Sequence, residues 1–363
     1  MAKICFFINN INLTGGTERV TSVIASALKK SGNEVHVLSL QCGYKPFFDL
    51  ESDIIISQLQ TEQNGRLLRI PLAIYRLREY LKCNDIDVLI DVDTMLSIYS
   101  LPASIGLKIR HICWEHFNYN VMLGKSSRII ARKLAAYLAD DVVTLTEYDK
   151  NLWLSNAKCN AKISVIPNPI TISLPEQHMK KQQKLFLAVG RLTYLKGFDL
   201  LLRAWAIAAR DTSDWRLRIV GSGEEQNNIV HLIRQLGIES NTELLPKTND
   251  VSKHYNEAAF FVLSSRFESF GLVILEALSH GLPVISFDCD SGPREIIKDQ
   301  LSGHLCQPGS VEHLAELIKR EINLYDIDYH RYECFSKRAK DDSKNYRVEH
   351  IIIEWSNLIN SKR

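Results

Sequence analysis

Short hydrophobic runs alternate with longer amphipathic segments along most of the chain. In the first half, largely apolar runs of four to eight residues stand at positions 3–8, 34–40, 88–92, 109–114, 142–145 and 163–166. Between them, apolar residues recur at helical spacing, as at Val20, Val23, Ile24, Ala27 and Leu28. This alternation predicts βαβ units, and therefore a parallel sheet covered by helices.

The pattern breaks near residues 167–169 and then restarts. Residues 171–184 are polar, basic and weakly periodic, which is typical of a linker. The second half predicts strands at 185–189, 215–220, 242–245, 259–263 and 283–287, with helices at 199–209 and 224–236. The sequence thus predicts an α/β protein of two doubly wound domains that meet near residue 170. We expect a cleft between them, at the carboxyl ends of the strands.

The composition is that of an ordinary globular protein. Hydrophobic residues make up 45% and charged residues 24%, and 44 Lys and Arg against 42 Asp and Glu leave a net charge of +2. This balance predicts no nucleic-acid partner. The eight cysteines show no CxxC pair or zinc-ligand spacing, which favours reduced thiols in the cytoplasm. No apolar run approaches 18 residues, so we expect peripheral membrane contact at most.

Glycine-containing loops follow the first predicted strand of each half. Gly15 and Gly16 precede the first helix, where adjacent glycines permit a positive φ and let a diphosphate approach the backbone. A tight turn without a ligand is the alternative interpretation. In the second half, Gly197 follows the strand predicted at 185–189. After the next predicted strand, Gly221 and Gly223 supply only two of the three glycines of the dinucleotide fingerprint, which is weak evidence for a nicotinamide cofactor.

A basic loop follows the strand predicted at 185–189. Arg191 and Lys196 lie five residues apart in it. Both could reach one anion, Arg191 through its planar fork and Lys196 as a point charge. Two solvated surface cations are the alternative interpretation.

The most specific segment spans residues 264–276. A strand ends in a loop that carries Glu268, and a helix begins near Gly271, which leaves the N–H groups of Phe270, Gly271 and Leu272 free to hold a phosphate. Glu276 lies inside an apolar stretch, where a carboxylate is costly unless it hydrogen-bonds a ligand or joins an ion pair. We expect Glu268 and Glu276 to hold opposite ends of one ligand.

In their order along the chain, these motifs resemble glycosyltransferase family 4, a group of retaining nucleotide-sugar enzymes with the two-domain GT-B fold. The resemblance covers nearly the whole chain and includes the segment 277–285 after Glu276. It implies domains at 1–170 and 171–345, with a C-terminal helix near 346–363 that returns to the first domain. Residues 291–297 resemble the version found in enzymes that use UDP-hexoses for surface polysaccharides.

The resemblance also implies roles for the candidate residues. In the donor site that it implies, the diphosphate is bound by Gly15, Gly16, Arg191 and Lys196. The sugar or a phosphate is bound by Glu268 and by the amides of Phe270, Gly271 and Leu272. The ribose is bound by Glu276. Arg191, Lys196 and a helix N-terminus would stabilise the leaving phosphate without a metal. Retention would follow from attack on the face that the phosphate leaves.

A histidine at a strand end is the candidate catalytic residue of the first domain. Family members carry a histidine facing the donor sugar at the position that His116 matches, and a polar strand-end residue is the alternative. Asp91 and Asp93 form a DxD motif, which binds Mn²⁺ in another glycosyltransferase fold. Two carboxylates supply few of the ligands that an octahedral metal site needs. We expect no metal and no other cofactor; Asp91 and Asp93 could instead line an acceptor pocket.

Two segments combine basic and apolar residues, as membrane-surface helices do. One contains Arg66, Arg69, Arg76, Arg78 and Lys82 among aliphatic residues. The other contains Lys125, Arg128, Arg132 and Lys133 beside Ile129 and Ile130. Such helices dock on anionic lipid, and a lipid-linked acceptor would require this; helices packed on the sheet with a solvated basic face are the alternative.

The expected protein is a retaining glycosyltransferase of the cytoplasm or the inner membrane face. It would move a hexose from a UDP-sugar to a glycan acceptor, which we expect to be lipid-linked, in polysaccharide, O-antigen or lipopolysaccharide assembly. Two alternatives remain: a sugar-nucleotide epimerase of the same fold, and a non-catalytic subunit that binds a nucleotide-sugar.

Overall fold

The computed structural model describes residues 1–60, 69–122, 124, 126–172, 183–210, 214–248 and 250–361. The chain divides into two compact units, Met1–Pro169 with Val348–Arg363, and Ile170–Arg347. The boundary falls one residue before the position expected from the sequence. Residues 173–182 of the expected linker lie outside the described ranges.

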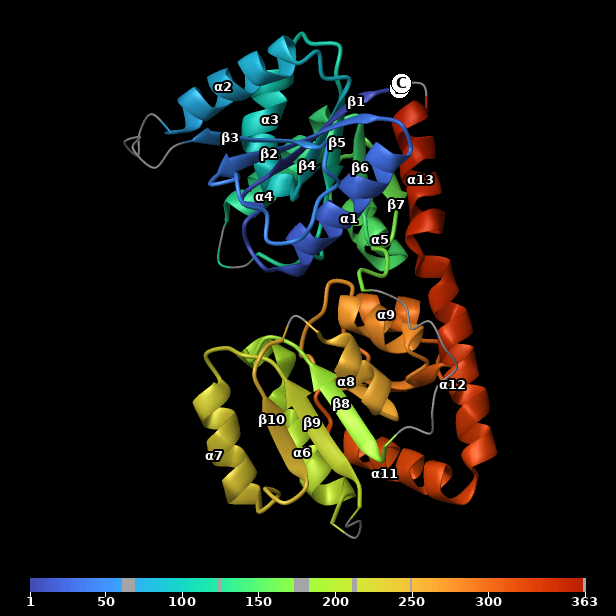
Figure 1. Cartoon of the computed structure of the whole chain (residues 1–363). Helices are drawn as coiled ribbons and strands as arrows, with labels where there is room; N and C mark the ends of the chain where they lie inside the picture. Colours follow the sequence, from blue (N-terminus) through green and yellow to red (C-terminus); the bar gives the residue numbers. More distant parts are fainter. Residues whose placement is uncertain are drawn as a thin grey trace. The chain divides into compact units, whose positions relative to one another are not determined.

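The first unit is built on a seven-stranded parallel sheet with the order β3-β2-β1-β4-β5-β6-β7 (Figure 1). Its strands are β1 (Lys3–Ile8), β2 (Glu34–Gln41), β3 (Ile55–Gln60), β4 (Val88–Val92), β5 (Arg110–Trp114), β6 (Asp141–Thr144) and β7 (Lys162–Val165). Its helices are α1 (Gly16–Lys30), α2 (Arg69–Cys83), α3 (Ser97–Ser104), α4 (Ser127–Leu138), α5 (Glu147–Asn156) and α13 (Val348–Asn360), with a 3₁₀ turn η2 (Thr94–Leu96).

Helices cover both faces of this sheet, which explains why its strands are almost continuously apolar. Cys5 and Phe7 of β1 pack in one cluster with Leu77 of α2 and Ala103 of α3. The alternate residues of β1 face the opposite side, where α1 and α13 contact each other (Figure 1). The ring of Trp114 at the end of β5 packs 4.8 Å from that of Trp355 in α13.

The second unit contains a six-stranded parallel sheet with the order β10-β9-β8-β11-β12-β13. Its strands are β8 (Leu185–Val189), β9 (Arg216–Val220), β10 (Thr242–Leu245), β11 (Phe260–Leu263), β12 (Val284–Phe287) and β13 (Gly303–Cys306). Its helices are α6 (Phe198–Ala208), α7 (Gln226–Leu236), α8 (Ser252–Glu257), α9 (Leu272–Ser279), α10 (Gly292–Ile296), α11 (Val311–Ile327) and α12 (Tyr329–Ser343), with 3₁₀ turns η3 (Tyr194–Lys196) and η4 (Lys344–Tyr346).

A large hydrophobic cluster of the second unit lies on one face of its sheet. Phe186 and Phe260 stack there at 5.0 Å and pack with Trp205 of α6, in a cluster that includes residues of α7 and α11. On the opposite face, Tyr255 of α8 lies 5.8 Å from Phe261 of β11. The predicted fold class, with two doubly wound parallel sheets, is confirmed.

Two edge strands were missed by the sequence prediction. β3 pairs only with β2, and β13 pairs only with β12, among the strands of the two sheets. Edge strands are buried less uniformly than central ones, and β3 mixes Ser57 and Gln58 with isoleucines. β13 is four residues long and begins with Gly303. Neither shows the apolar run by which the other strands were recognised.

Each sheet reverses its strand order beside its first strand. β1 lies between β2 and β4, and β8 lies between β9 and β11. The loops that leave the carboxyl ends of β1 and β4, and of β8 and β11, therefore diverge to opposite sides. In open parallel sheets this point forms the crevice where ligands bind.

Candidate functional site

Lys196 and Glu268 meet at the strand-order reversal of the second unit. Lys196 lies in the loop after β8, and Glu268 lies in the loop after β11, the strand beside it. The Lys196 ammonium donates to Oε1 of Glu268, which also accepts a 2.8 Å hydrogen bond from the Ser265 hydroxyl. The Glu268 side chain is 9% exposed and that of Lys196 is 26% exposed. An anion held here would meet a fixed positive charge and an adjacent acceptor group.

The backbones of the loops at the carboxyl ends of these strands lie very close to one another. Gly197 has a φ of +62°, and a Cβ there would lie 2.0 Å from the carbonyl oxygen of Ser264. A Cβ on Gly221, after β9, would lie 1.9 Å from the carbonyl oxygen of Gly190. The glycines of the segment 221–223 are thus explained by strand-end packing rather than by a dinucleotide fingerprint.

The loop that carries Glu268 continues directly into α9. α9 begins at Leu272, and its N-cap Gly271 has a φ of +97° and no side-chain cap. Phe270 is buried, with its ring 6.2 Å from that of Tyr346. The amides of these loop residues therefore lie at a helix N-terminus, where the helix dipole favours an anion.

Ser291 supports the Glu268 loop from the next strand-end segment. Its hydroxyl hydrogen-bonds the carbonyl oxygens of Glu268 at 2.6 Å and Ser269 at 3.0 Å. The following Gly292 lies against the Phe270 carbonyl: a Cβ on Gly292 would be 1.8 Å from the carbonyl oxygen of Phe270. No role for Ser291 was expected from the sequence, because its hydrogen bond joins residues 23 positions apart.

Glu276 is buried in α9 and is held by hydroxyl groups. Its Oε2 accepts a 2.9 Å hydrogen bond from Tyr255 of α8, and Oε1 accepts one of 3.4 Å from Thr171. Tyr255 in turn stacks on His280 with ring centroids 5.2 Å apart. Tyr255 was not among the predicted site residues, since nothing in its local sequence indicates this contact.

Arg191 and the Gly15–Gly16 pair are arranged differently from the sequence-based expectation. The Arg191 side chain is 76% exposed and pairs with Glu224 at 3.7 Å, whereas Lys196 pairs with Glu268. Gly15 is the N-cap of α1 with a φ of −83°, and Gly16 is the first helical residue. A positive φ, which adjacent glycines would permit, is found at neither position. An N-cap takes extended backbone, so the helix start alone explains their conformation.

His116 lies just beyond the end of β5 in the first unit. It is 7% exposed, its ring centroid lies 4.4 Å from that of Trp114, and its Nε2 is buried without a hydrogen-bond partner among the described residues. Burial lowers the pKa of His116 to about 3. The imidazole is therefore neutral at physiological pH, and it can exchange a hydrogen bond but cannot supply a positive charge.

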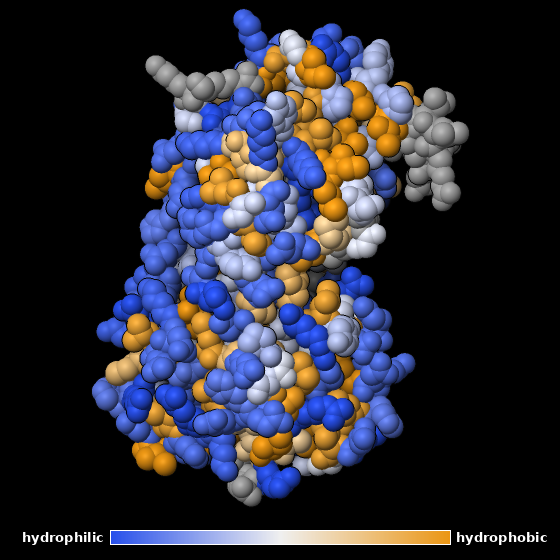
Figure 2. Space-filling view, turned by 180° about the vertical axis from the view of Figure 1, so that it is seen from behind, coloured by the Kyte–Doolittle hydropathy of each residue, from blue (hydrophilic) through white to orange (hydrophobic). Residues whose placement is uncertain are grey.

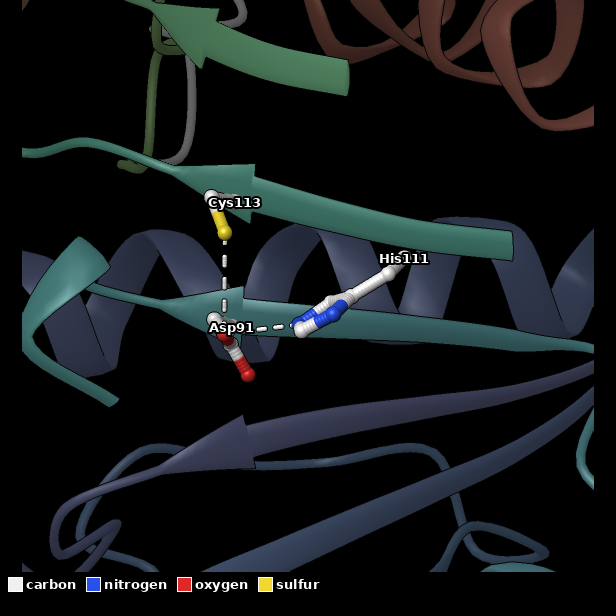
Figure 3. Close-up of side chains that lie close together, drawn as sticks. All are labelled: Asp91, His111 and Cys113. Carbon is white, nitrogen blue, oxygen red and sulfur yellow. Dashed lines mark hydrogen bonds and ion pairs between the residues drawn. The ribbon is translucent and has the colours of Figure 1, made fainter. Parts of the chain in front are cut away.

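Asp91, His111 and Cys113 form a buried cluster on neighbouring strands β4 and β5 (Figure 3). Their ligand atoms lie within 4.8 Å of one another, so a metal ion could be held here. In the structure, Oδ2 of Asp91 accepts hydrogen bonds from His111 Nε2 at 2.8 Å, the Ser100 hydroxyl at 2.5 Å and Cys113 Sγ at 3.6 Å. Burial and the nearby Asp91 raise the pKa of the Cys113 thiol, which favours the thiol form that donates to a carboxylate.

The DxD motif does not present two carboxylates to one ligand. Asp93 has a φ of +96° and lies in a bidentate ion pair with Arg128, at 3.2 and 2.6 Å. Asp91 instead joins the buried cluster with His111. The carboxylate of Asp93 is occupied by Arg128 of α4, which donates to both of its oxygens.

Several arginines of the two predicted basic helices turn inward, whereas Lys82 of α2 and Lys133 of α4 are exposed. In α4, Arg128 and Arg132 are buried at 4% and 1% exposure. In α2, Arg76 donates to the carbonyl oxygen of Leu59. Arg78 donates to the carbonyl oxygens of Ala103 in α3 and of Ile105, which follows α3. These arginines donate hydrogen bonds to carboxylate and carbonyl oxygens, and these bonds compensate for the hydration that the guanidinium groups lose. Residues 66 and 125 of the same prediction lie outside the described ranges, as does the side chain of residue 69.

Two family models together cover most of the sequence. The model described as Glycosyltransferase Family 4 matches residues 14–174, and that described as Glycosyl transferases group 1 matches residues 171–341. An uncharacterized glycosyltransferase of Haemophilus influenzae is 36% identical over 99% of this chain and 100% of its own length. The chain belongs to the family 4 glycosyltransferases.

Other similar proteins extend this assignment. The amylovoran biosynthesis glycosyltransferase AmsD of Erwinia amylovora is 30% identical to this family 4 glycosyltransferase, over 99% of this chain and 100% of the relative. The crystal structure of a Staphylococcus aureus TarM mutant, in complex with fondaparinux, alpha-GlcNAc-glycerol and UDP, matches with a TM-score of 0.83 at 16% identity, over 99% of this chain and all of that one. The predicted GT-B fold is confirmed. None of the described helices has both the length and the hydrophobicity needed to cross a bilayer.

Proposed function

We propose that this family 4 glycosyltransferase transfers a hexose, with retention, from a UDP-sugar to a lipid-linked glycan in the assembly of a surface polysaccharide or lipopolysaccharide. The observation that carries the proposal is the contact between Lys196 and Glu268 at the strand-order reversal of the second unit. It places a cation for phosphate and an acceptor for sugar hydroxyls side by side, where parallel sheets bind ligands.

In this proposal the second unit binds the donor through charges and backbone amides. Lys196 and Arg191 neutralise the diphosphate, and Arg191 can turn toward it because its side chain is mostly exposed. Glu268 and the amides at residues 270–272 hold the sugar and a phosphate oxygen. Glu276 accepts hydrogen bonds from the ribose hydroxyls, with Tyr255 orienting its carboxylate. These groups stabilise the departing UDP without a required metal.

The first unit contributes His116 and the start of α1. His116 is neutral, so in this proposal its imidazole exchanges a hydrogen bond with a sugar hydroxyl rather than shuttling a proton. The amides at Gly15 and Gly16 open a helix of 15 residues, whose N-terminus favours the diphosphate. No protein nucleophile is assigned, and the incoming hydroxyl would attack from the face that UDP leaves.

Relatives support the choice of substrate class. One relative is named a lipopolysaccharide 1,6-galactosyltransferase of Salmonella typhimurium, and another, from Campylobacter jejuni, is named for an undecaprenol-linked acceptor. A structure from Anabaena with the same fold holds UDP-glucose. The lipopolysaccharide in one name and the undecaprenol-linked glycan in the other support a lipid-linked glycan as the acceptor class.

We further propose peripheral membrane contact through the outward face of α4. Ile129, Ile130, Tyr137 and Leu138 are all exposed there, and Lys133 is exposed among them. Figure 2 shows hydrophobic side chains gathered on the side of this unit where Figure 1 places α2, α3 and α4. An aliphatic face with an interspersed cation suits an anionic bilayer, which also contains a lipid-linked acceptor.

The test is turnover of a panel of UDP-, GDP-, ADP- and dTDP-hexoses with lipid-linked glycans extracted from bacterial membranes. The proposal expects one UDP-hexose to be consumed with formation of a new α-linked product, as judged by NMR of the anomeric proton. A β-linked product from an α-linked donor would refute retention. Conversion of the donor sugar without any acceptor would instead identify an epimerase.

A further inference from the structure

The inward face of α4 lies against the loop that carries His116. Arg128 and Arg132 are one helical turn apart on this face, and both are almost completely buried. Arginine is rarely buried to this extent unless each donor finds a partner. The partners of Arg132 all lie within residues 115–121, the segment that follows β5.

The guanidinium of Arg132 donates hydrogen bonds to four residues of this segment. Arg132 Nε donates to Oε2 of Glu115 at 2.9 Å. Its Nη2 donates to the carbonyl oxygen of Asn118 at 3.1 Å. Its Nη1 donates to the carbonyl oxygens of Tyr119 and Val121, the latter at 3.1 Å. The side chain therefore determines the path of the backbone on the C-terminal side of His116.

Glu115 constrains the backbone next to His116. Its Oε1 accepts a 3.0 Å hydrogen bond from the amide of Phe117, so the carboxylate bridges across His116 to the following residue. Its Oε2 accepts from Arg132 and from the Thr94 hydroxyl at 2.6 Å. The amide of Glu115 donates to the Val143 carbonyl at 2.9 Å, which ties the start of the loop to β6.

We propose that Arg132 is a positioning residue for His116, holding the loop 115–121 in the shape that presents the imidazole to the donor sugar. The inference rests on the proposed function, in which His116 contacts the transferred hexose. Arg132 itself touches no substrate in this proposal. It acts through the carboxylate of Glu115 and the loop carbonyls.

Arginine is specifically required by this arrangement. Its planar fork has five donors that point in fixed directions, whereas a lysine ammonium has three donors on one nitrogen and cannot reach acceptors spread over the loop. Arg132→Lys keeps the charge near Glu115 but releases loop carbonyls. The Arg132→Lys variant therefore distinguishes an effect on the geometry of the loop from an effect of neutralising the Glu115 carboxylate.

The test is a double-mutant cycle of Arg132→Lys and His116→Ala, measured as UDP release from the UDP-hexose that the wild type consumes, with the lipid-linked glycan as acceptor of the hexose. We expect each single variant to lose about 10- to 100-fold in kcat, with little change in KM for the donor. If Arg132 acts through His116, the double variant is no slower than His116→Ala alone. Losses that multiply in the double variant would show that Arg132 affects turnover independently, and would overturn the proposal.

A matched control lies at the other end of the same strand. Arg110 begins β5, is 10% exposed in its side chain, and pairs with Asp141 at 2.8 Å. Arg110→Lys disturbs a comparably buried ion pair without touching the loop 115–121. We expect it to leave kcat within about twofold of wild type, so that a general loss of stability is distinguished from lost positioning.

A second measurement needs no turnover. The His116 ring signals, assigned by their absence in His116→Ala, are followed by NMR between pH 4 and 8. Burial keeps them from titrating in the wild type, and we expect them to titrate in Arg132→Lys but not in Arg110→Lys. Unchanged His116 signals in Arg132→Lys would overturn the proposal. Full activity of His116→Ala would instead contradict the proposed function, while the NMR result would still decide whether Arg132 positions the ring.

Discussion

The Tyr255 hydroxyl donates a 2.9 Å hydrogen bond to Oε2 of Glu276 inside the second unit. Tyr255 lies in α8 and Glu276 in α9, so the contact joins two helices on the same face of the sheet. It orients a buried carboxylate that we propose for the ribose. A side chain outside the recognised motifs therefore shapes the proposed donor site.

We predict that Tyr255→Phe raises the Kd for UDP by about five- to tenfold, because a buried hydrogen bond contributes about 1 kcal/mol. Glu276→Gln should weaken UDP binding further, since the amide removes the charge that attracts two hydroxyl donors. Isothermal titration calorimetry measures both. Tyr332→Phe is the matched control, because Tyr332 is a buried tyrosine that donates to the Ala259 carbonyl at 3.0 Å, in the core. Equal UDP affinity in all of these proteins would refute the ribose assignment.

Removal of the Lys196 ammonium should impair turnover more than binding. Lys196→Ala leaves the departing phosphate without its nearest charge, so we expect kcat to fall by about 100- to 1000-fold. Lys184→Ala provides the comparison. Lys184 precedes β8 and pairs with Asp214 at 2.6 Å, at the amino ends of the strands rather than at their carboxyl ends. Steady-state UDP release measures the effect. Loss of activity in both variants alike would point to folding rather than catalysis.

Gly197 should tolerate no side chain. We expect Gly197→Ala to cost about 3 kcal/mol of unfolding free energy, since a methyl group would meet the Ser264 carbonyl as well as an unfavourable φ. Gly237→Ala, at a φ of +66° with nothing within 4 Å of a Cβ, should cost only about 1 kcal/mol. Urea denaturation gives both values. Equal costs would mean that the strand-end contact does not constrain the loop.

Acid should destabilise the wild type through His116. The folded pKa is about 3 and the ordinary value is 6.5, so below pH 6.5 the unfolded chain binds a proton that the native state does not. Stability is thus lost as pH falls from 6.5, by about 1.4 kcal/mol per pH unit, or about 2 kcal/mol by pH 5. Urea denaturation of His116→Leu should lack this loss. His330→Leu should retain it, because His330 is exposed.

Membrane contact should depend on the aliphatic face of α4 rather than on its arginines. Replacing an inserted isoleucine by serine removes about 1.5 kcal/mol of burial, so Ile130→Ser should lower partitioning onto anionic vesicles about tenfold. Ile207→Ser, at an exposed position of α6 in the second unit, should leave partitioning unchanged. Sedimentation with phosphatidylglycerol vesicles measures it. Equal partitioning of Ile130→Ser and wild type would exclude this face.

Much of the donor half was predictable because its determinants are local. Lys196 and Glu268 each follow an apolar strand, and parallel strands end at one edge of a sheet, so the sequence places both residues at that edge. Their contact depends on β8 lying beside β11, which the structure supplies. The prediction that Arg191 and Lys196 bind one diphosphate stays a prediction, and in the structure the exposed Arg191 side chain pairs with Glu224. The Ser291 contact to the Glu268 carbonyl was not visible, since no local pattern indicates it.

The sequence by itself determined the two parallel sheets, the order of the motifs and the family, because apolar periodicity and motif spacing are properties of neighbouring residues. Only the tertiary structure decided which way α4 turns. The pattern of arginines beside isoleucines fits either orientation, and Asp93 and Glu115, brought to this helix from β4 and β5, supply the partners that make burial of Arg128 and Arg132 favourable. Pairing of distant charges is a property of the assembled fold, and it places arginines inside and isoleucines outside.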